Sequence, residues 1–244
     1  MLLLTACASP ASRLKIHSNA LMPKSGLNSL KSVLSKTGDG KYLLETIRPR
    51  IQLAYDLKGA FFAEYSCPRN KRGKTSVCVI SLNPKLKTLP PTHPLTAMVT
   101  IHELTHIAQE ALPLEKRVIR YYMETDAYSA GMRAWLELDP KKQYPIPHGL
   151  MRDFENADIA ETLNMLRSSY ERGLEEFVDM INLRYHRLCL AQYPHDAAVC
   201  GKYQTLQETL STAQDPLIKQ GWEMLRQKDA VFRAPETNQT TRDN

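Results

Sequence analysis

The sequence has no long hydrophobic run, no internal repeat and no strong excess of charge of one sign. None of its apolar stretches approaches the ~20 consecutive residues that a transmembrane helix requires, which excludes a polytopic membrane protein. Its 32 lysines and arginines, against 26 aspartates and glutamates, give a net charge of +6 that is spread thinly along the chain. This mild excess permits contact with an anionic surface but does not indicate a nucleic-acid reader, so we expect no nucleic-acid partner.

What remains is an ordinary globular composition. With 43% apolar and 24% charged residues, the chain is neither wholly disordered nor collagen-like. Its 244 residues are enough to bury a core in one large domain or two small ones.

The N-terminal sequence, MLLLTAC, is apolar and ends in Cys7. Its last four residues resemble a bacterial lipobox, in which the cysteine is lipidated and becomes the mature N-terminus. A complete signal peptide has a basic segment and roughly 7–15 apolar residues, whereas only six residues without charged side chains precede Cys7. We therefore interpret residues 1–7 as the remnant of a signal peptide, and the alternative is an apolar N-terminus with a chance cysteine. With Ala8 and Ser9 following, the resemblance implies a lipoprotein of the bacterial periplasm anchored to the outer membrane.

Four further cysteines form two pairs with equal spacing. Cys67 and Cys78 are 11 residues apart, and so are Cys189 and Cys200. The spacing lacks the C-x2–4-C pattern of a structural zinc site, which disfavours a site built from four thiolates. Of the three connectivities open to four cysteines, two local disulfides are the simplest, with buried free thiols as the alternative. An even set behind an export-like N-terminus indicates disulfides in an oxidising compartment.

Hydrophobic periodicity predicts a mostly helical chain with a small sheet. Short β-branched or aromatic runs predict strands over 51–55, 60–65 and 76–82. The strand over 76–82 is either an ordinary edge strand or the edge along which an extended peptide lies. Apolar residues at steps of three and four predict helices over 26–35, 41–47, 95–111, 115–138 and 156–190. The segment 202–233 is predicted to form one or two helices, with a break near Pro216.

Composition divides the chain into five segments. The signal remnant, 1–7, is followed by a tether over 8–25 that carries serine, proline and asparagine. We expect residues 26–140 to form the core and 141–233 to form a helical part of the same domain. The polar residues 234–244 are expected to be a disordered tail.

An H-E-x-x-H motif, HELTH, begins at His102 on the predicted helix over 95–111. Residues four apart lie on the same face of a helix, so the imidazoles of His102 and His106 can bind one tetrahedral zinc ion. Glu103 beside them is placed to take a proton from zinc-bound water, which makes it the candidate catalytic base. The alternative is a pair of structural histidines satisfied by backbone and solvent.

A catalytic zinc site commonly has three protein ligands, so a third ligand is expected from a separate element. Glu124 and Asp126 both lie on the helix predicted after Pro113, where a turn can bring that helix back level with the histidines. They are two residues apart and point to nearly opposite sides, so only one can face the metal. We favour Glu124, which shares a face with Tyr128 and Gly131, where glycine permits close helix approach. Asp126 would then form a salt bridge or a cap.

The runs HELTHIAQ (102–109) and ETDAY (124–128) resemble the compact gluzincin-type zinc metallopeptidases. The similarity extends upstream through GKYLL (40–44) and VISLNP (79–84), and it covers about residues 38–135. The C-terminal hundred or so residues share no such resemblance.

This resemblance implies a ligand set and a fold. In the family, the first glutamate of E-x-[DE]-A is the usual third zinc ligand, which corresponds to Glu124. Many members carry an aspartate where this chain has Tyr128, so the usual carboxylate behind a zinc histidine is not expected here. The implied fold is zincin-like: α+β, mostly α, with a small antiparallel sheet and a helical C-terminal extension.

Together these features predict a zinc-dependent metallopeptidase of the bacterial cell envelope, in which zinc-activated water attacks a peptide bond and Glu103 is the general base. Its substrate would be an unidentified peptide or protein, and a lipid on Cys7 would hold it to the membrane. One alternative is a non-catalytic zincin-fold lipoprotein that acts as a binding or scaffold module, and another is hydrolysis of a non-peptide amide such as a cell-wall crosslink. Glu103 favours an enzyme, since a scaffold needs no base between two ligands. The donor for the developing oxyanion stays open among Tyr128, Tyr144, His148, His186 and His195.

Overall fold

The structure of the chain is a computed structural model that describes residues 20–57, 61–68, 77–111 and 122–234. Cys7, the Pro113 turn, most of the tether and nearly all of the C-terminal tail lie outside the described residues. The fold is α+β and mostly α, as the sequence predicts. Within the described ranges, none of the helices combines the length and apolar character needed to cross a membrane.

Two short helices come first, α1 (Lys24–Leu34) and α2 (Gly38–Thr46). Thr37 caps α2, because its side-chain oxygen accepts a hydrogen bond from the backbone N–H of Gly40 at 3.1 Å. A Cβ atom on Gly40 would collide with the carbonyl oxygen of Leu34, so only glycine fits where α2 turns away from α1.

A three-stranded sheet follows, with the strand order β1–β3–β2. β1 (Arg50–Ala54) pairs with β3 (Val77–Leu82) in parallel, and β2 (Ala63–Ser66) pairs with β3 in antiparallel orientation. The prediction of an antiparallel sheet is therefore wrong in one of its two pairings. The interpretation of residues 76–82 as an edge strand is also wrong, since β3 lies in the centre.

The burial of β3 explains its central position. Five of its six residues are buried, because its continuous apolar run is covered on both faces. β2 and β3 are consecutive and form an antiparallel pair, whereas β1 occupies the opposite edge of β3 in parallel. Strand pairing of this kind joins distant segments, which local periodicity does not specify.

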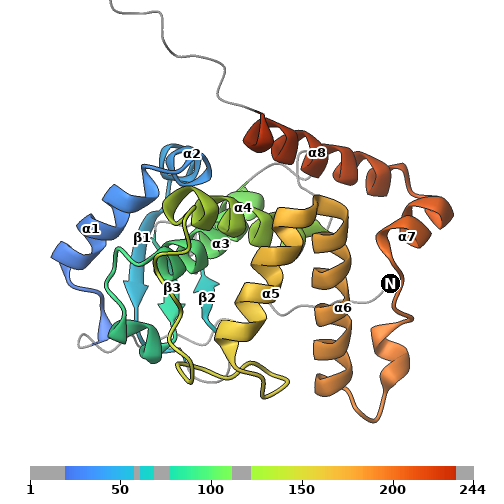
Figure 1. Ribbon diagram of the computed structural model, residues 1–244, viewed down its shortest axis with the longest axis horizontal. Coiled ribbons are helices and arrows are strands. Elements are labelled where there is room, and N and C mark those ends of the chain that lie inside the picture. The colour runs from blue at the N-terminus through green and yellow to red at the C-terminus, as the bar shows by residue number, and fades with distance from the viewer. Residues whose placement is uncertain (1–19, 58–60, 69–76, 112–121, 235–244) are drawn as a thin grey trace, which may run out of the picture.

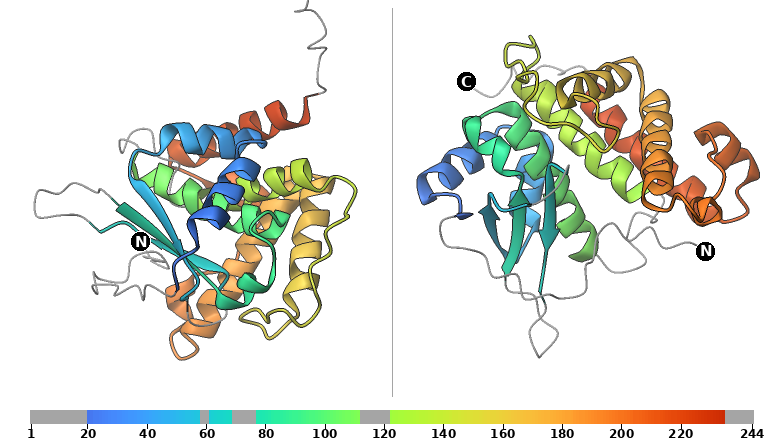
Figure 2. Two further views of the ribbon diagram at one scale, coloured as in Figure 1. Left: turned by 90° about the vertical axis from the view of Figure 1, so that its left-hand side faces the viewer. Right: turned by 90° about the horizontal axis from the view of Figure 1, so that it is seen from below.

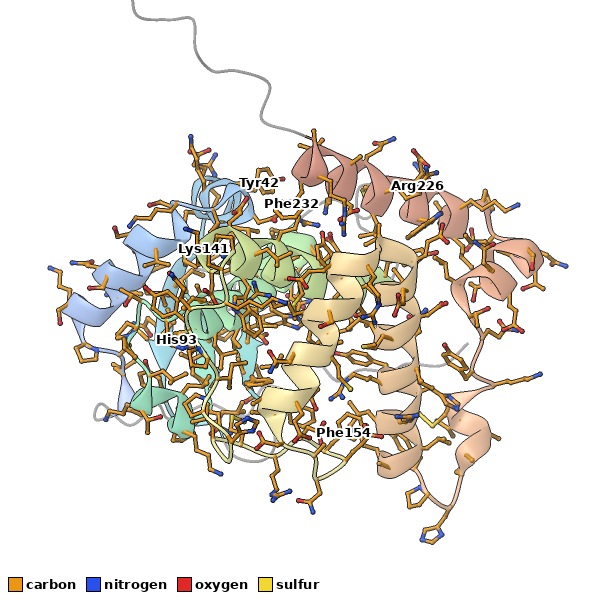
Figure 3. The ribbon with its side chains drawn as sticks, viewed as in Figure 1. Tyr42, His93, Lys141, Phe154, Arg226 and Phe232 are labelled. Atoms are coloured by element: carbon orange, nitrogen blue, oxygen red, sulfur yellow. A yellow bond between two sulfur atoms is a disulfide. The ribbon has the colours of Figure 1, made fainter. Side chains whose placement is uncertain are left out.

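The long helix α3 (Pro94–Ala111) packs against the sheet and against α4 (Met123–Leu138). Proline is favoured at the first position of a helix, and the Nδ1 atom of His93 accepts from the backbone N–H of Leu95 at 3.1 Å; His93 is labelled in Figure 3. Most of α3 is buried on all sides, as expected for a helix in the centre of a domain.

A single helix was expected over 156–190, and the structure instead has two, α5 (Ile159–Arg172) and α6 (Leu174–Gln192). The break falls at Gly173, where the backbone is extended. Glycine is a poor helix former, and the break lets α6 fold back beside α5 so that Tyr170 and Phe177 both reach the core. The prediction of one helix is wrong at this residue.

The C-terminal part ends in α7 (Leu206–Thr212) and α8 (Pro216–Arg233), with the break at Pro216 that the sequence predicts. Two short 3-10 helices, η2 (Pro84–Thr88) and η5 (Ala197–Cys200), complete the described elements.

Both expected disulfides are present. Cys67 is bonded to Cys78, with their Cα atoms 4.3 Å apart, and this bond links the end of β2 to β3. Cys189 is bonded to Cys200, with their Cα atoms 5.6 Å apart. This second bond ties α6 to η5 and appears in Figure 3 as a sulfur–sulfur bond.

The elements form layers around α3 and α4. α1, α2 and the sheet lie on one side of these two helices, and α5 and α6 lie on the other (Figures 1 and 2). A single hydrophobic cluster runs through the layers from Met22 to Leu225. α3 is therefore held on several sides, which gives its side chains fixed positions.

Candidate metal centre

α3 presents His102 and His106 on one face. They are one helical turn apart, and their Nε2 atoms lie 3.1 Å from each other. The ring of His106 is almost completely buried, with 2% of the residue exposed, whereas His102 is partly exposed. The helix therefore brings two nitrogen donors to one point that solvent reaches from the His102 side.

Glu124 completes a group of three donors from the first turn of α4. Its Oε2 atom lies 3.5 Å from Nε2 of His102 and 3.3 Å from Nε2 of His106. These three side chains form a group that could hold a metal ion. The structure thus brings together His102, His106 and Glu124, as the sequence predicts.

The spacing of these three atoms fits zinc. Donors about 2.0–2.1 Å from a tetrahedral zinc ion lie ~3.3 Å from one another, because they occupy the corners of a tetrahedron. The observed separations of 3.1, 3.3 and 3.5 Å scatter around that value. Two imidazole nitrogens and one carboxylate oxygen are also a ligand set that zinc accepts, with a fourth position left for water or substrate.

The electrostatics of the group favour a cation. Burial would raise the pKa of Glu124, but its contacts with His102 and His106 outweigh burial and hold the pKa well below the usual value. Burial would lower the pKa of His106, but the hydrogen bond and charge of Glu124, together with the charge of Glu103, raise it to about 9. The carboxylates therefore favour positive charge at the position of the nitrogen donors.

Gln109 fixes the ring of His106. The amide nitrogen of Gln109 donates to Oδ2 of Asp126 at 3.0 Å and to the carbonyl of Met123 at 3.2 Å. Its amide oxygen therefore faces Nδ1 of His106, at 3.0 Å, and accepts a hydrogen bond from it. With the proton on Nδ1, the lone pair of Nε2 is available to a metal.

Asp126 lies behind this contact rather than among the donors. It is 1% exposed, and its Oδ1 atom accepts from Nζ of Lys228 on α8 at 2.7 Å. Asp126 thus forms the salt bridge that the sequence offers as its alternative role, and it is connected to His106 through Gln109.

Aromatic rings surround the histidines. The ring of Tyr128 meets the ring of His102 edge-on, with centroids 4.4 Å apart, and Tyr65 of β2 stacks on His106 at 5.8 Å. Nδ1 of His102 is buried without a hydrogen-bond partner among the described residues. The ring of His102 is therefore held by its edge-on contact with Tyr128, at the position where many members of the family that the sequence resembles carry an aspartate.

Tyr185 of α6 is a site residue that the sequence does not single out. Its hydroxyl group donates to Oε2 of Glu124 at 2.6 Å. Burial, with the nearby Tyr128 and Glu124, raises the pKa of Tyr185 well above its usual value, so the hydroxyl keeps its proton. The apolar spacing that predicts a helix here includes position 185, but nothing in that pattern distinguishes Tyr185 from a core aromatic.

Glu103 lies beside the donors and is 6% exposed. Burial raises the pKa of its carboxyl group, while the positive charges of His102 and His106 lower it and the negative charges of Glu124 and Glu64 raise it. Glu103, next to His102 in the sequence, thus interacts electrostatically with the three donors and is not one of them.

Four of the five residues that the sequence offers as oxyanion donors lie in other contacts, and only Tyr128 borders the metal centre. His148 pairs with Asp158 at the start of α5, and Tyr144 meets His93. His186 faces Tyr203, and His195 is exposed after α6.

Comparison of the chain with protein-family models, with curated proteins and with solved structures finds no match.

Proposed function

We propose that the protein is a zinc-dependent metallopeptidase, with His102, His106 and Glu124 as its zinc ligands and Glu103 as its general base. The observation that carries the proposal is the spacing of the three donor atoms, 3.1 to 3.5 Å, which matches three corners of a zinc tetrahedron. A buried carboxyl group beside them supplies the one further function that hydrolysis requires.

Zinc in this site would polarise a substrate carbonyl and acidify a water molecule. The residues of the chain then have separate tasks. The carboxylate of Glu103 would accept the proton that the water molecule loses and then donate it to the leaving amine. Gln109 keeps the lone pair of His106 directed at the donors, and Tyr185 holds the carboxylate of Glu124 in place.

The sheet edge nearest to the site is β2 and not β3. Among the described residues β2 pairs with β3 alone, and Tyr65 on β2 stacks on His106. An extended peptide that added a strand to this edge would pass beside the donor group. This arrangement supports a peptide as the substrate and transfers the expected role from residues 76–82 to β2.

We also propose that the protein works in the bacterial cell envelope, anchored by a lipid on Cys7. The two disulfides support an oxidising compartment. The test is incorporation of a labelled fatty acid and partitioning of the protein into detergent. Incorporation of the fatty acid and partitioning into detergent should both be lost in Cys7→Ser and kept in the control Ala8→Ser.

Zinc content and turnover, measured on the same samples, test the enzymatic proposal. Purified wild type should contain about one zinc ion per chain and cleave peptides from a mixed library, and chelation should abolish cleavage. Glu103→Gln should keep its zinc and lose at least ~100-fold in turnover, because the change removes a base and no ligand. Glu45→Gln, an exposed change on α2, is the matched control and should behave as wild type.

Three other results would contradict the proposal. A wild type that binds zinc but cleaves neither peptides nor peptidoglycan would favour the binding or scaffold module. Release of fragments from peptidoglycan, with no peptide cleaved, would favour hydrolysis of a cell-wall amide. Wild type that binds no zinc would exclude both hydrolytic functions.

A further inference from the structure

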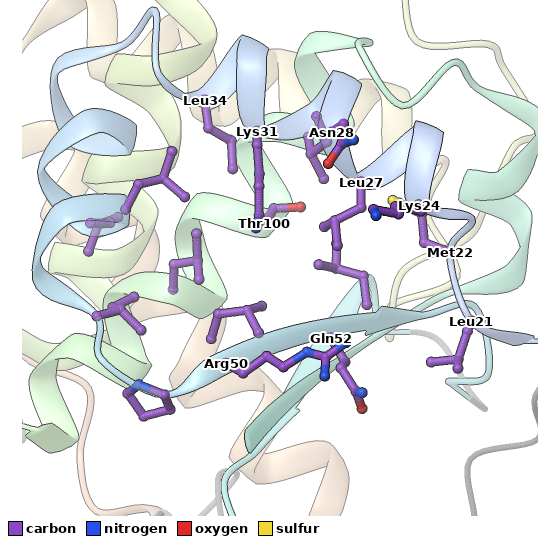
Figure 4. A pocket seen from close by; sticks show the side chains of 18 residues that line it. Leu21, Met22, Lys24, Leu27, Asn28, Lys31, Leu34, Arg50, Gln52 and Thr100 are labelled. Carbon is purple, nitrogen blue, oxygen red and sulfur yellow. The ribbon is translucent and has the colours of Figure 1, made fainter. Parts of the chain in front are cut away.

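A pocket of about 550 Å³ lies between α1, α2, β1 and α3, and Figure 4 shows it from close by. Its volume falls within the ~300–1,000 Å³ of small-molecule sites. α3 contributes Thr100 and Leu104, which precede His102 and His106 by two residues each. Two residues are ~200° apart around a helix, so the pocket and the metal centre use opposite faces of α3.

The walls of the pocket are aliphatic. Of its 18 lining residues, 12 are leucine, isoleucine, methionine or proline, and none is aromatic. Five of these leucines are each no more than 3% exposed: Leu30, Leu34, Leu43, Leu53 and Leu104. Flexible aliphatic walls without a flat ring surface suit an alkyl chain better than an aromatic ligand.

The rim of the pocket is cationic. Lys24, Lys31 and Arg50 line it and are exposed, and none of the described residues that line it is acidic. None of these three cations forms an ion pair with a described residue. In Figure 4, Lys31 extends from α1 over the opening and Arg50 runs along β1 on the other side. Cations above an apolar interior are complementary to a molecule with an anionic head and an apolar tail.

We propose that this pocket binds a single-chain anionic amphiphile of the long-chain carboxylate type. The carboxylate pairs with Lys31 and Arg50, and the alkyl chain lies among the leucines of α1, α2 and β1. Burial of each methylene group strengthens binding, and the cations of the rim select the charge of the head group. This inference does not depend on the proposed peptidase activity, since it uses none of the residues of the metal centre.

Calorimetric titration of the full-length protein with dodecanoate, below its micelle concentration, tests the proposal. Saturable binding at about one molecule per chain is expected, unchanged by a metal chelator. Dodecylammonium has the same tail and the opposite charge, and it should bind at least roughly tenfold more weakly. Equal binding of the two amphiphiles would overturn the assigned role of the cations.

Substitutions at the rim locate the site. Lys31→Glu combined with Arg50→Glu should weaken dodecanoate binding at least roughly tenfold. Lys36→Glu combined with Lys41→Glu changes the net charge equally at exposed positions outside the pocket and should bind as wild type. Leu44→Trp places a large side chain in the pocket from a half-buried position. It should weaken the binding of dodecanoate more than the binding of its shorter homologue octanoate.

Three outcomes overturn the inference. The first is equal affinity in the rim pair and its control pair. The second is absence of saturable dodecanoate binding to wild type, which would leave the pocket as a site for another segment or partner. The third is binding of anionic phospholipid vesicles without binding of free dodecanoate, which would assign the cations to a membrane surface. All these variants change exposed or half-buried side chains, so we expect each of them to fold. A thermal melt of each variant checks this.

Discussion

Lys228 of α8 donates a hydrogen bond to Oδ1 of Asp126 on α4 across 2.7 Å, although 102 residues separate them in the sequence. The other carboxylate oxygen of Asp126 accepts from Gln109, which in turn holds Nδ1 of His106. The last described helix is therefore connected to a metal-centre histidine by three successive contacts. Both carboxylate oxygens of Asp126 accept hydrogen bonds away from the histidines, and Glu124 is the carboxylate that faces His102 and His106.

A pair of alanine variants tests this division of roles. Glu124→Ala removes a donor and should abolish tight zinc binding. Asp126→Ala keeps all three donors but frees Gln109 to turn, so zinc affinity should fall only by about 10-fold to 100-fold. Competition with a chromophoric zinc chelator measures both affinities. Loss of zinc from Asp126→Ala together with retention in Glu124→Ala would reverse the ligand assignment and leave the enzyme class standing.

Tyr185→Phe isolates the hydroxyl group that holds Glu124. The ring remains, while a hydrogen bond to a charged carboxylate, with a typical net contribution of about 1.5–3 kcal/mol, is lost. Zinc affinity should fall measurably with the protein still folded, because Glu124 then samples other rotamers. Tyr193→Phe removes an exposed hydroxyl just after α6 and is the control. Equal zinc affinity of the two variants would show that Tyr185 only fills space.

The parts of the site that the sequence predicts are those that local spacing specifies. His102 and His106 are one turn apart on any helix, so their convergence follows from residue order alone. Glu124 follows from the helix face that it shares with Tyr128 and Gly131, because Asp126 points to nearly the opposite side. Tyr185 and Lys228 lie 61 and 102 residues from the side chains that they contact, and no short-range pattern encodes such contacts.

The parts of the fold that were wrongly predicted have the same cause. β1 and β3 are neighbours in the sheet and pair in parallel, although β2 lies between them in the sequence. Hydrophobic runs indicate where strands are but not which strands pair. At Gly173 the apolar spacing continues in register from α5 into α6, so periodicity alone does not reveal that the chain folds back. Glycine was the one local indication of a break.

From the contacts of Asp153 we predict that the stability of the fold depends on pH. Burial would raise the pKa of the Asp153 carboxyl group, but hydrogen bonds from Thr162, from the backbone N–H of Ala157 and from Arg184 outweigh burial and lower it. A lowered pKa in the folded state means that the carboxylate stabilises the fold above its unfolded pKa of about 3.9. This contribution is lost as the pH falls through the lower folded value.

Asp153→Asn should therefore reduce the free energy of unfolding at pH 7 by roughly 1–3 kcal/mol. The difference in the free energy of unfolding between the variant and wild type should narrow as the pH falls below about 4, because the carboxylate of Asp153 in wild type then becomes protonated and loses its charge. Urea unfolding at a series of pH values measures both quantities. Asp196→Asn changes an exposed aspartate in the loop after α6 and should leave the curve unchanged. A difference that stays constant down to pH 3 would show that the effect of Asp153 is not ionic.

From the position of Gly131 we predict that the distance between α3 and α4 controls the positions of the three donor atoms. Gly131 lies seven residues after Glu124, two turns along the same face of α4. A Cβ atom at this position would be 3.0 Å from the backbone oxygen of Met98 and 3.2 Å from its Cγ atom, so α4 approaches the backbone of α3 closely here. Because Glu124 is on α4 while His102 is on α3, a wider separation carries one donor away from the others.

Gly131→Val should therefore lower stability by about 1–3 kcal/mol through overpacking, and it should also weaken zinc binding. Gly131→Ala should have a smaller effect, since the better helix propensity of alanine offsets part of the crowding by roughly 0.5–1 kcal/mol. Gly173→Val is the control, because a Cβ atom there meets no other atom within 4 Å. Zinc affinity and urea unfolding, measured on the same preparations, distinguish the two effects. If Gly131→Val is destabilised but binds zinc as tightly as wild type, the close approach of α3 and α4 serves packing alone and does not set the geometry of the donors.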